Sequence, residues 1–253
     1  MQTAALGLRQ VVGPLACALA FTQGCELSDI LGKTHNSHVL VNVTTTHHAS
    51  QVQGEPLTVA TDGQLRVFDT DEGWSVTLSQ AYVVTAGADL HRCDSTVETI
   101  DMYYGALAED IKLHDYDELT LGASKVTPGD FCELAVHYGP YVDGQPFNAV
   151  MKEKVVDATF YLEGVAVRGA ERVPFALRST ADITVNLDLS TIQGGNPMEV
   201  SGSEDFPVEV RVSKTYDRFF DGIDFSLVNQ DDLLTHVEAV LALETRVSVE
   251  DYD

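Results

Sequence analysis

The sequence predicts an antiparallel β-sandwich, and three observations support this fold class. Apolar and polar residues alternate with a period of two over most of the chain after residue 36. Turn-forming pairs such as Pro128-Gly129 and Asp221-Gly222 separate the alternating segments. After the N-terminal region, no apolar stretch is long enough to span a bilayer as a helix. Many short alternating strands joined by turns are typical of a sandwich.

The first alternating segments define two faces that should be buried. In "HVLVNVTTTHH" one face carries Val39, Val41, Val43, Thr45 and His47, which places His47 at the rim of the core. In "GWSVTLSQAYVV" one face carries Trp74, Val76, Leu78 and Tyr82. The pattern continues in "FCELAVHYG", "ATFYLEGVAV", "VPFALRSTADITVNLDLS", "FPVEVRVSK" and "TRVSVEDYD". These segments predict the strands of the sandwich.

Two stretches depart from this alternation. "NQDDLLTHVEAVLAL" predicts one short C-terminal helix with Asn229 as its N-cap, since apolar residues recur there at helical spacing. Acidic side chains near its start favour the same reading, because they face the positive end of the helix dipole. "STVETIDMYYGALAEDIKL" is an insertion whose structure the pattern does not define.

The N-terminal region predicts export. Residues 1–24 hold one basic residue followed by a short apolar run, as in a signal peptide, and Gly24-Cys25 resembles a bacterial lipoprotein cleavage box. We therefore expect an export signal over 1–24, lipidation at Cys25, a tether over 25–36 and a β-sandwich domain over 37–253. Plain cleavage, or a signal that is retained, is the alternative to lipidation. Two stacked sandwiches dividing near Met151 are the alternative to one domain.

The cysteines and the charge narrow the possible environment and partners. Cys17 lies within the signal, so Cys93 and Cys132 remain as a pair, and export favours a disulfide between them that closes a loop of about 40 residues. The chain has 15 Lys and Arg against 39 Asp and Glu. This acidic balance argues against nucleic acid as a partner, because phosphates would be repelled.

Histidines are the side chains most able to carry chemistry. Motifs for nucleophilic catalysis or phosphate binding are absent from the sequence, so we expect a protein that is not an enzyme. Imidazole ligands favour copper or zinc. We expect His47, His91 and His137 to be metal ligands, with His91 and His137 held close by the disulfide. Histidines that simply solvate strand faces are the alternative reading.

Other candidates are weaker. Calcium is a lesser possibility at two acidic segments, "DTDEG" (Asp69, Asp71) and "HDYDE" (Asp115, Asp117), which match only part of a calcium loop. The methionines Met102, Met151 and Met198 could supply a thioether for copper(I), but none of them lies in a motif. Trp74 is the only tryptophan, and we expect either a core residue or one that is modified or adjacent to the metal.

Four segments together resemble a known family. They are "VLVNVTTTHH", "GWSVTLSQAYVV", "PGDFCELAVHYG" and "ATFYLEGVAV" with the strands after it. The pattern is similar to the MbnP-like exported copper-binding proteins and, more loosely, to the copper-repressible surface proteins of methanotrophs. The resemblance implies a β-sandwich that binds copper through histidine, here His47, and in some members through a tryptophan oxidised to kynurenine. "YGPYVDGQPFNAV" has no tryptophan where many members are tryptophan-rich, which weakens the expectation for Trp74.

The sequence thus predicts an exported protein, lipid-anchored in the periplasm or at the outer-membrane surface. It would bind copper, or less favourably zinc, for uptake, storage or sensing of the metal. The alternative is a lipoprotein sandwich without metal that binds a protein or polysaccharide partner. Its expected contact surface is the aromatic pair Tyr103 and Tyr104.

Overall fold

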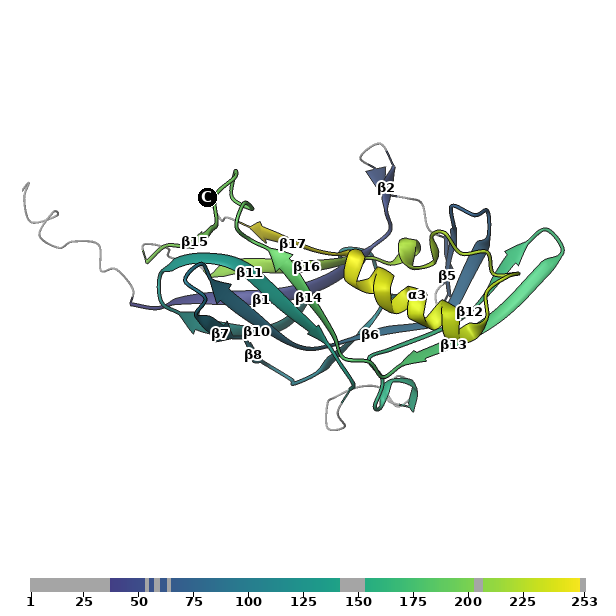
Figure 1. The fold of residues 1–253 in the computed structure, drawn as a ribbon, viewed down its shortest axis with the longest axis horizontal. Helices are drawn as coiled ribbons and strands as arrows, with labels where there is room; N and C mark the ends of the chain where they lie inside the picture. Colours follow the sequence, from purple (N-terminus) through teal and green to yellow (C-terminus); the bar gives the residue numbers. More distant parts are fainter. Residues whose placement is uncertain are drawn as a thin grey trace, which may run out of the picture. The chain divides into compact units, whose positions relative to one another are not determined.

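Two β-sheets pack face to face in the computed structural model, which confirms the predicted all-β sandwich (Figure 1). The structure describes residues 37–52, 55–56, 60–62, 65–141, 153–202 and 207–250. Ser37–Asp253 form one compact unit. The predicted export signal, the tether, Cys25 and Met151 lie outside the described residues.

The first sheet has five strands with β1 at its centre. Its order is β17 (Thr245–Glu250), β16 (Val208–Thr215), β1 (Val39–His48), β10 (Leu119–Val126) and β8 (Asp101–Met102). β1 runs antiparallel to β10 but parallel to β16. The sandwich is thus mostly antiparallel, as predicted, and the parallel pair of β1 with β16 is an exception whose two strands are joined by a long crossover connection rather than a hairpin.

The second sheet is built around the long strand β6 (Ser75–Arg92). Its main path is β13 (Glu171–Ser179), β12 (Phe160–Arg168), β6, β11 (Gly129–Tyr138) and β14 (Ile183–Asp188). Shorter strands extend it: β4 (Ala60–Asp62), β5 (Leu65–Asp69), β7 (Val97–Thr99), β9 (Leu107–Asp110) and β15 (Met198–Val200). A separate ribbon pairs β2 (Gln51–Val52) with β3 (Glu55–Pro56). The insertion between the cysteines thus supplies β7, β8 and β9.

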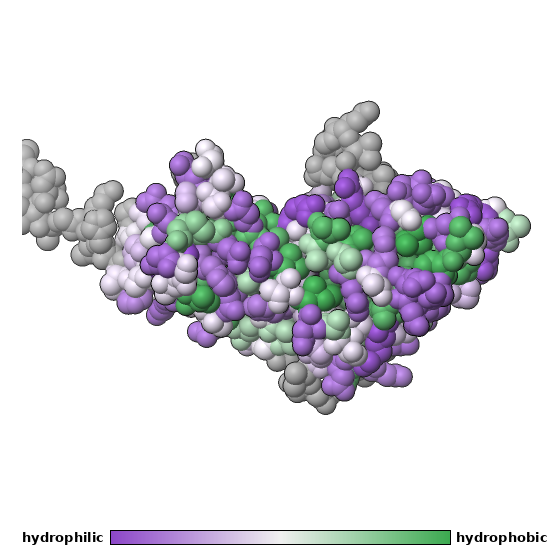
Figure 2. All heavy atoms as spheres, in the orientation of Figure 1, coloured by the Kyte–Doolittle hydropathy of each residue, from purple (hydrophilic) through white to green (hydrophobic). Residues whose placement is uncertain are grey.

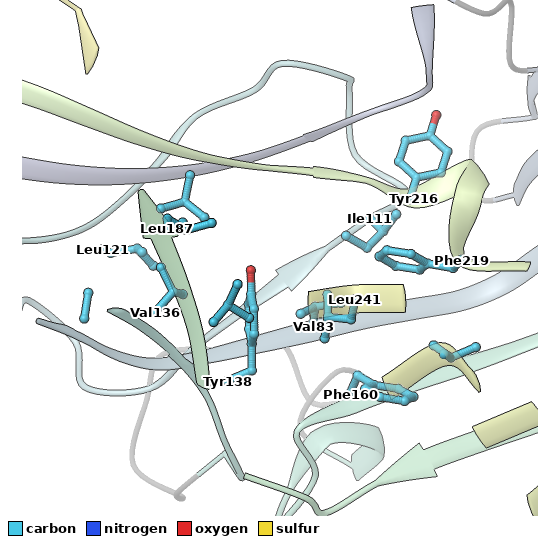
Figure 3. Packing of buried hydrophobic residues seen from close by; sticks show 14 of the residues in the cluster. Val83, Ile111, Leu121, Val136, Tyr138, Phe160, Leu187, Tyr216, Phe219 and Leu241 are labelled. Atoms are coloured by element: carbon cyan, nitrogen blue, oxygen red, sulfur yellow. The ribbon is translucent and has the colours of Figure 1, made fainter. Parts of the chain in front are cut away.

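Apolar side chains from both sheets fill the space between them (Figure 3). Val41 and Val43 point inward from β1, as the alternation predicts. On β6 the alternation is interrupted by a bulge, where the register to β12 shifts between Glu163 and Gly164. Tyr82 consequently leaves the face of Trp74 and joins a smaller second apolar cluster, so the prediction that both share one face is wrong.

The predicted C-terminal helix is confirmed as α3 (Gln230–Leu243). The Asn229 side chain accepts a hydrogen bond from the backbone N–H of Asp232, as an N-cap does. Leu233, Val237 and Leu241 are buried on one face of the helix. The short 3-10 helix η1 (Tyr216–Phe220) precedes α3, and β17 follows it directly (Figure 1).

A disulfide joins Cys93 to Cys132, 39 residues apart, as the sequence predicts. It ties the turn after β6 to its neighbour β11. On the face drawn in Figure 2 the surface is mainly hydrophilic, with scattered apolar residues. Among the helices of the described residues, none has the length and apolarity needed to cross a membrane.

Candidate functional site

His91 and His137 lie on neighbouring strands and on the same face of the second sheet. His91 is opposite Glu133 in the pairing of β6 with β11, and Asp89 is two residues before His91 on the same face. His137 follows two positions beyond Ala135, which pairs with Asp89. We call these four side chains, Asp89, His91, Glu133 and His137, the β6–β11 face. Residues that alternate with them, such as Leu90 and Val136, are buried in the core, so this face points outward.

The four side chains form two histidine–carboxylate pairs. His137 Nε2 is 2.9 Å from Asp89 Oδ2, and His137 Nδ1 is 3.1 Å from the Thr184 hydroxyl oxygen. His91 Nδ1 is 4.0 Å from Glu133 Oε1, which is too long for a hydrogen bond. The side chains of both histidines are about one third exposed, at 33% for His91 and 36% for His137. Dissolved ions can therefore reach both imidazole rings.

Asp89 is the electrostatic centre of this face. Its partial burial acts to raise the pKa of the carboxyl group, but hydrogen bonds from Thr99 and His137 outweigh burial and hold the pKa below its ordinary value. Interaction with His91 acts in the same direction. The carboxylate is thus ionised at neutral pH and available as a ligand for a cation.

His47 has a different environment from His91 and His137, because it is buried in the core between the sheets. It is 1% exposed, which corrects the prediction of a rim position. Its Nδ1 is 2.7 Å from Glu109 Oε1, and its Nε2 is 3.2 Å from the carbonyl oxygen of Leu113. Both ring nitrogens are therefore occupied by contacts within the protein. Neither nitrogen is open to a metal in this arrangement.

Glu109 and Lys214 complete a buried ionic cluster around His47. Lys214 Nζ is 2.6 Å from Glu109 Oε2 and also donates to the Thr45 hydroxyl, which itself bonds to Glu109. Burial alone would raise the pKa of Glu109, but Lys214 and His47 lower it to about 2. Burial acts to lower the pKa of Lys214, and its interaction with Glu109 raises it above the ordinary value. Glu109 and Lys214 therefore form a buried ion pair, in which the lysine of this chain is the counter-ion of the carboxylate.

The sequence reasoning did not identify Glu109 or Lys214. A signal for Lys214 does exist, because the lysine is in phase with Val208, Val210 and Val212 on the inward face of its strand. A lysine at an inward position implies a buried partner of opposite charge. That partner, Glu109, lies in the insertion between the cysteines, where the alternation of apolar and polar residues is too weak to show which side chains point inward.

Trp74 is a core residue with no exposed surface. Its ring packs edge-on against Phe225, and the Arg168 guanidinium lies 4.3 Å from the ring centroid. The indole nitrogen is buried without a hydrogen-bond partner. The expectation that Trp74 is a core residue is thereby confirmed, and its modification stays a prediction.

The structure does not bring the three predicted ligands together, since His47 is in the core and the other two are on the outward face. Within the described part of the chain, no group of three or more His, Cys, Asp or Glu side chains is arranged to hold a metal ion. The acidic segments considered for calcium have other roles. Asp71 accepts a hydrogen bond from the backbone N–H of Gly222, and Asp115 pairs with Arg66. Met198 is fully buried in the core.

The fold and these contacts define the chain as a β-sandwich with histidine–carboxylate pairs on one outward face. Neither a protein-family model nor a curated protein matches the sequence. Among solved structures, the chain is distantly similar to "MbnP from Methylosinus trichosporium", with a TM-score of 0.42 and 9% sequence identity. That similarity covers 85% of this chain and 99% of the other.

Proposed function

We propose that this protein binds a divalent transition metal, copper or zinc, on the β6–β11 face. It would do so as an exported, lipid-anchored protein that takes up, stores or senses the metal at the cell surface. What supports the proposal is the presence of two partly exposed imidazoles and two carboxylates on adjacent strands. Imidazole and carboxylate together suit zinc and copper(II).

The gap between His91 and Glu133 carries the proposal. Nitrogen and oxygen ligands lie about 2.0–2.2 Å from zinc, so in tetrahedral geometry two of them on one ion are about 3.3–3.6 Å apart. The 4.0 Å between His91 Nδ1 and Glu133 Oε1 is slightly longer, so a small rotation of these partly exposed side chains would bring both atoms to one ion. Asp89, two residues before His91 on the same face, would supply a third ligand through the carboxylate oxygen that does not contact His137.

His137 has a different role in this arrangement. Its hydrogen bond to Asp89 orients the carboxylate, as outer groups commonly orient metal ligands. Loss of such a group costs roughly 10–100-fold in metal affinity, whereas loss of a direct ligand costs more. The proposed ligands are therefore His91, Asp89 and Glu133, with His137 as the positioning residue. His47 leaves the ligand set because both of its nitrogens are engaged in the core.

Calorimetric titration of the purified, oxidised chain with Cu²⁺ and with Zn²⁺ tests this assignment. We expect one ion per chain, no detectable binding in His91→Ala, and an affinity about 10–100-fold lower in His137→Ala. Exposed His114 is off this face, so His114→Ala is the matched control and should bind like the wild type. Binding should also weaken on acidification, because only neutral imidazole coordinates a metal. Full binding by the His91→Ala variant would refute the assignment.

A binding module without metal is the second candidate, and one observation favours it. Tyr103 and Tyr104 are adjacent and each is 54% exposed, next to the edge strand β8. Exposed aromatic side chains of this kind are frequent in interfaces with proteins and other ligands. On this account Tyr103→Ala/Tyr104→Ala would abolish binding of a protein or polysaccharide, and His91→Ala would leave it unchanged. The metal proposal predicts instead that His91→Ala abolishes metal binding and that Tyr103→Ala/Tyr104→Ala leaves it unchanged.

A further inference from the structure

A cavity of about 300 Å³ lies away from the β6–β11 face, where β1 and β16 end and β17 begins. It is open to solvent, and every side chain that lines it carries a polar group: His48, Ser50, Thr215, Arg218, Glu244 and Arg246. Its volume is at the lower end of the range for small-molecule sites. Neither the predicted functions nor the proposed metal site uses these residues.

Three charged side chains in this cavity face one another without hydrogen bonds between them. Arg218 Nη1 and Arg246 Nη2 are each 4.0 Å from the same oxygen of Glu244, Oε1. That distance is too long for a hydrogen bond, so both guanidinium groups keep donors for a ligand. Glu244 is only 17% exposed, and its carboxylate keeps capacity to accept from a ligand. The cavity thus offers two cations and one anion.

Behind the lining residue His48 lies a strained tyrosine of the neighbouring loop. The His48 ring stacks on Tyr116 with 5.1 Å between centroids and 6° between planes. Tyr116 has φ 66°, a left-handed conformation that is costly for a tyrosine. Strained residues of this kind persist where the surrounding structure enforces them, and they are concentrated at functional sites.

Buried groups beneath the loop enforce this conformation. Arg66, 2% exposed, donates to the carbonyl oxygens of Ile111 and Leu113 and pairs with Asp115 at 2.8 Å. His47 also bonds to the Leu113 carbonyl, and its own carbonyl accepts from the Tyr116 N–H. The loop that carries Tyr116 is therefore fixed to the core on both sides. This support fixes Tyr116 and, through ring stacking, orients the His48 ring that lines the cavity.

The charges of the cavity select the class of ligand. The chain carries a net charge of −24, so a simple anion meets long-range repulsion as it approaches. A zwitterion has no net charge and can use all three groups of the cavity. We propose that this cavity binds a free amino acid, with its carboxylate on Arg218 and Arg246 and its ammonium group on Glu244. The Thr215 hydroxyl and the His48 ring border the same space.

Ligand-observed NMR on the metal-free chain, kept in a chelator, tests this proposal independently of the metal site. The probes are an equimolar mixture of the standard amino acids, acetate alone and inorganic phosphate alone. We expect at least one amino acid to bind at millimolar concentration or below, and acetate and phosphate to bind at least 10-fold more weakly. Arg218→Gln/Arg246→Gln should lower amino-acid affinity by at least 10-fold.

Two further variants make the outcome decisive. Glu244→Gln should weaken amino-acid binding and leave any acetate binding unchanged or stronger, because the carboxylate beside both guanidinium groups is removed. Arg172 is exposed on β13, away from the cavity, so Arg172→Gln is the matched control and should bind like the wild type. Absence of amino-acid binding to the folded wild type would overturn the proposal. Equal binding of acetate or phosphate would do so too, as would full amino-acid binding by the double arginine variant.

Discussion

Glu109 is the residue on which the interior of the sandwich depends most. Its carboxylate lies between His47 and Lys214, and all three side chains are at most 2% exposed. A buried ion pair contributes little net stability, because desolvation of its members offsets their attraction. Removal of one partner is nevertheless costly, because the other is left as an uncompensated buried charge.

We predict that Glu109→Gln lowers the free energy of unfolding by about 3–5 kcal/mol, because Lys214 then lacks its counter-charge. Urea denaturation at pH 7 measures this loss. Glu163→Gln is the matched control, since Glu163 forms a surface ion pair with Lys154, and it should cost about 1 kcal/mol or less. Equal losses in the two variants would contradict the role given to Glu109.

The same residue should make stability depend on pH in the acid range. The pKa of Glu109 falls from its ordinary value of 4.5 to about 2 in the folded protein. Its contribution is therefore complete above pH 4.5 and is lost as the pH falls towards 2, by roughly 3 kcal/mol in total. Thermal unfolding between these pH values should show this loss in the wild type and a much smaller one in Glu109→Gln.

Single residues also show which contacts could be predicted from the sequence and which could not. Period-two alternation correctly placed Val41, Val43 and His47 on the inward face of β1. It could not show that a carboxylate 62 positions away bonds to the His47 ring, because that contact depends on how the two sheets pack. A buried, doubly bonded histidine and an accessible one look the same in a single sequence.

Among the elements, β6 and β11 determine the candidate site. Their antiparallel register places His91 opposite Glu133, and the Cys93–Cys132 disulfide closes the end of the pair. Alternation predicted both strands, and the cysteine count predicted the bond. The bulge in β6 and the parallel pairing of β1 with β16 were not predictable, since both are set by partner strands distant in sequence.

We predict that Cys93→Ser/Cys132→Ser lowers the free energy of unfolding by roughly 3–4 kcal/mol, because the unfolded chain gains the freedom of an open loop. Urea denaturation of this variant, with the wild type under reducing and oxidising conditions, measures the effect. Metal affinity should also fall, because His91 is two residues from Cys93. A loss below about 1 kcal/mol would show that packing alone fixes this end of the two strands.

At the scale of the whole molecule, the negative net charge and the expected export are consistent with the proposed binding of metal ions outside the cytoplasm. A net charge of −24 attracts metal ions and raises their local concentration. The disulfide is of the kind favoured by oxidising compartments. The expected lipid anchor at Cys25 would keep the β-sandwich at a membrane surface.

The anchor gives a prediction of its own. Cys25→Ser should move the protein from the membrane fraction to the soluble fraction of the cell envelope, because the lipid is its expected attachment. Fractionation with immunodetection, and intact mass of the purified protein, measure this change. Ser28→Ala, three residues away in the same segment, is the control and should stay with the membrane. A wild-type chain found in the soluble fraction at its unmodified mass would contradict lipidation.

The most direct test of the central claim is the metal content of the protein isolated from cells without added metal. The wild type and His91→Ala are purified in parallel and analysed by mass spectrometry of the elements. The account predicts about one equivalent of copper or zinc in the wild type and almost none in His91→Ala. A wild type without either metal, or equal metal in both proteins, would contradict a metal site on the β6–β11 face.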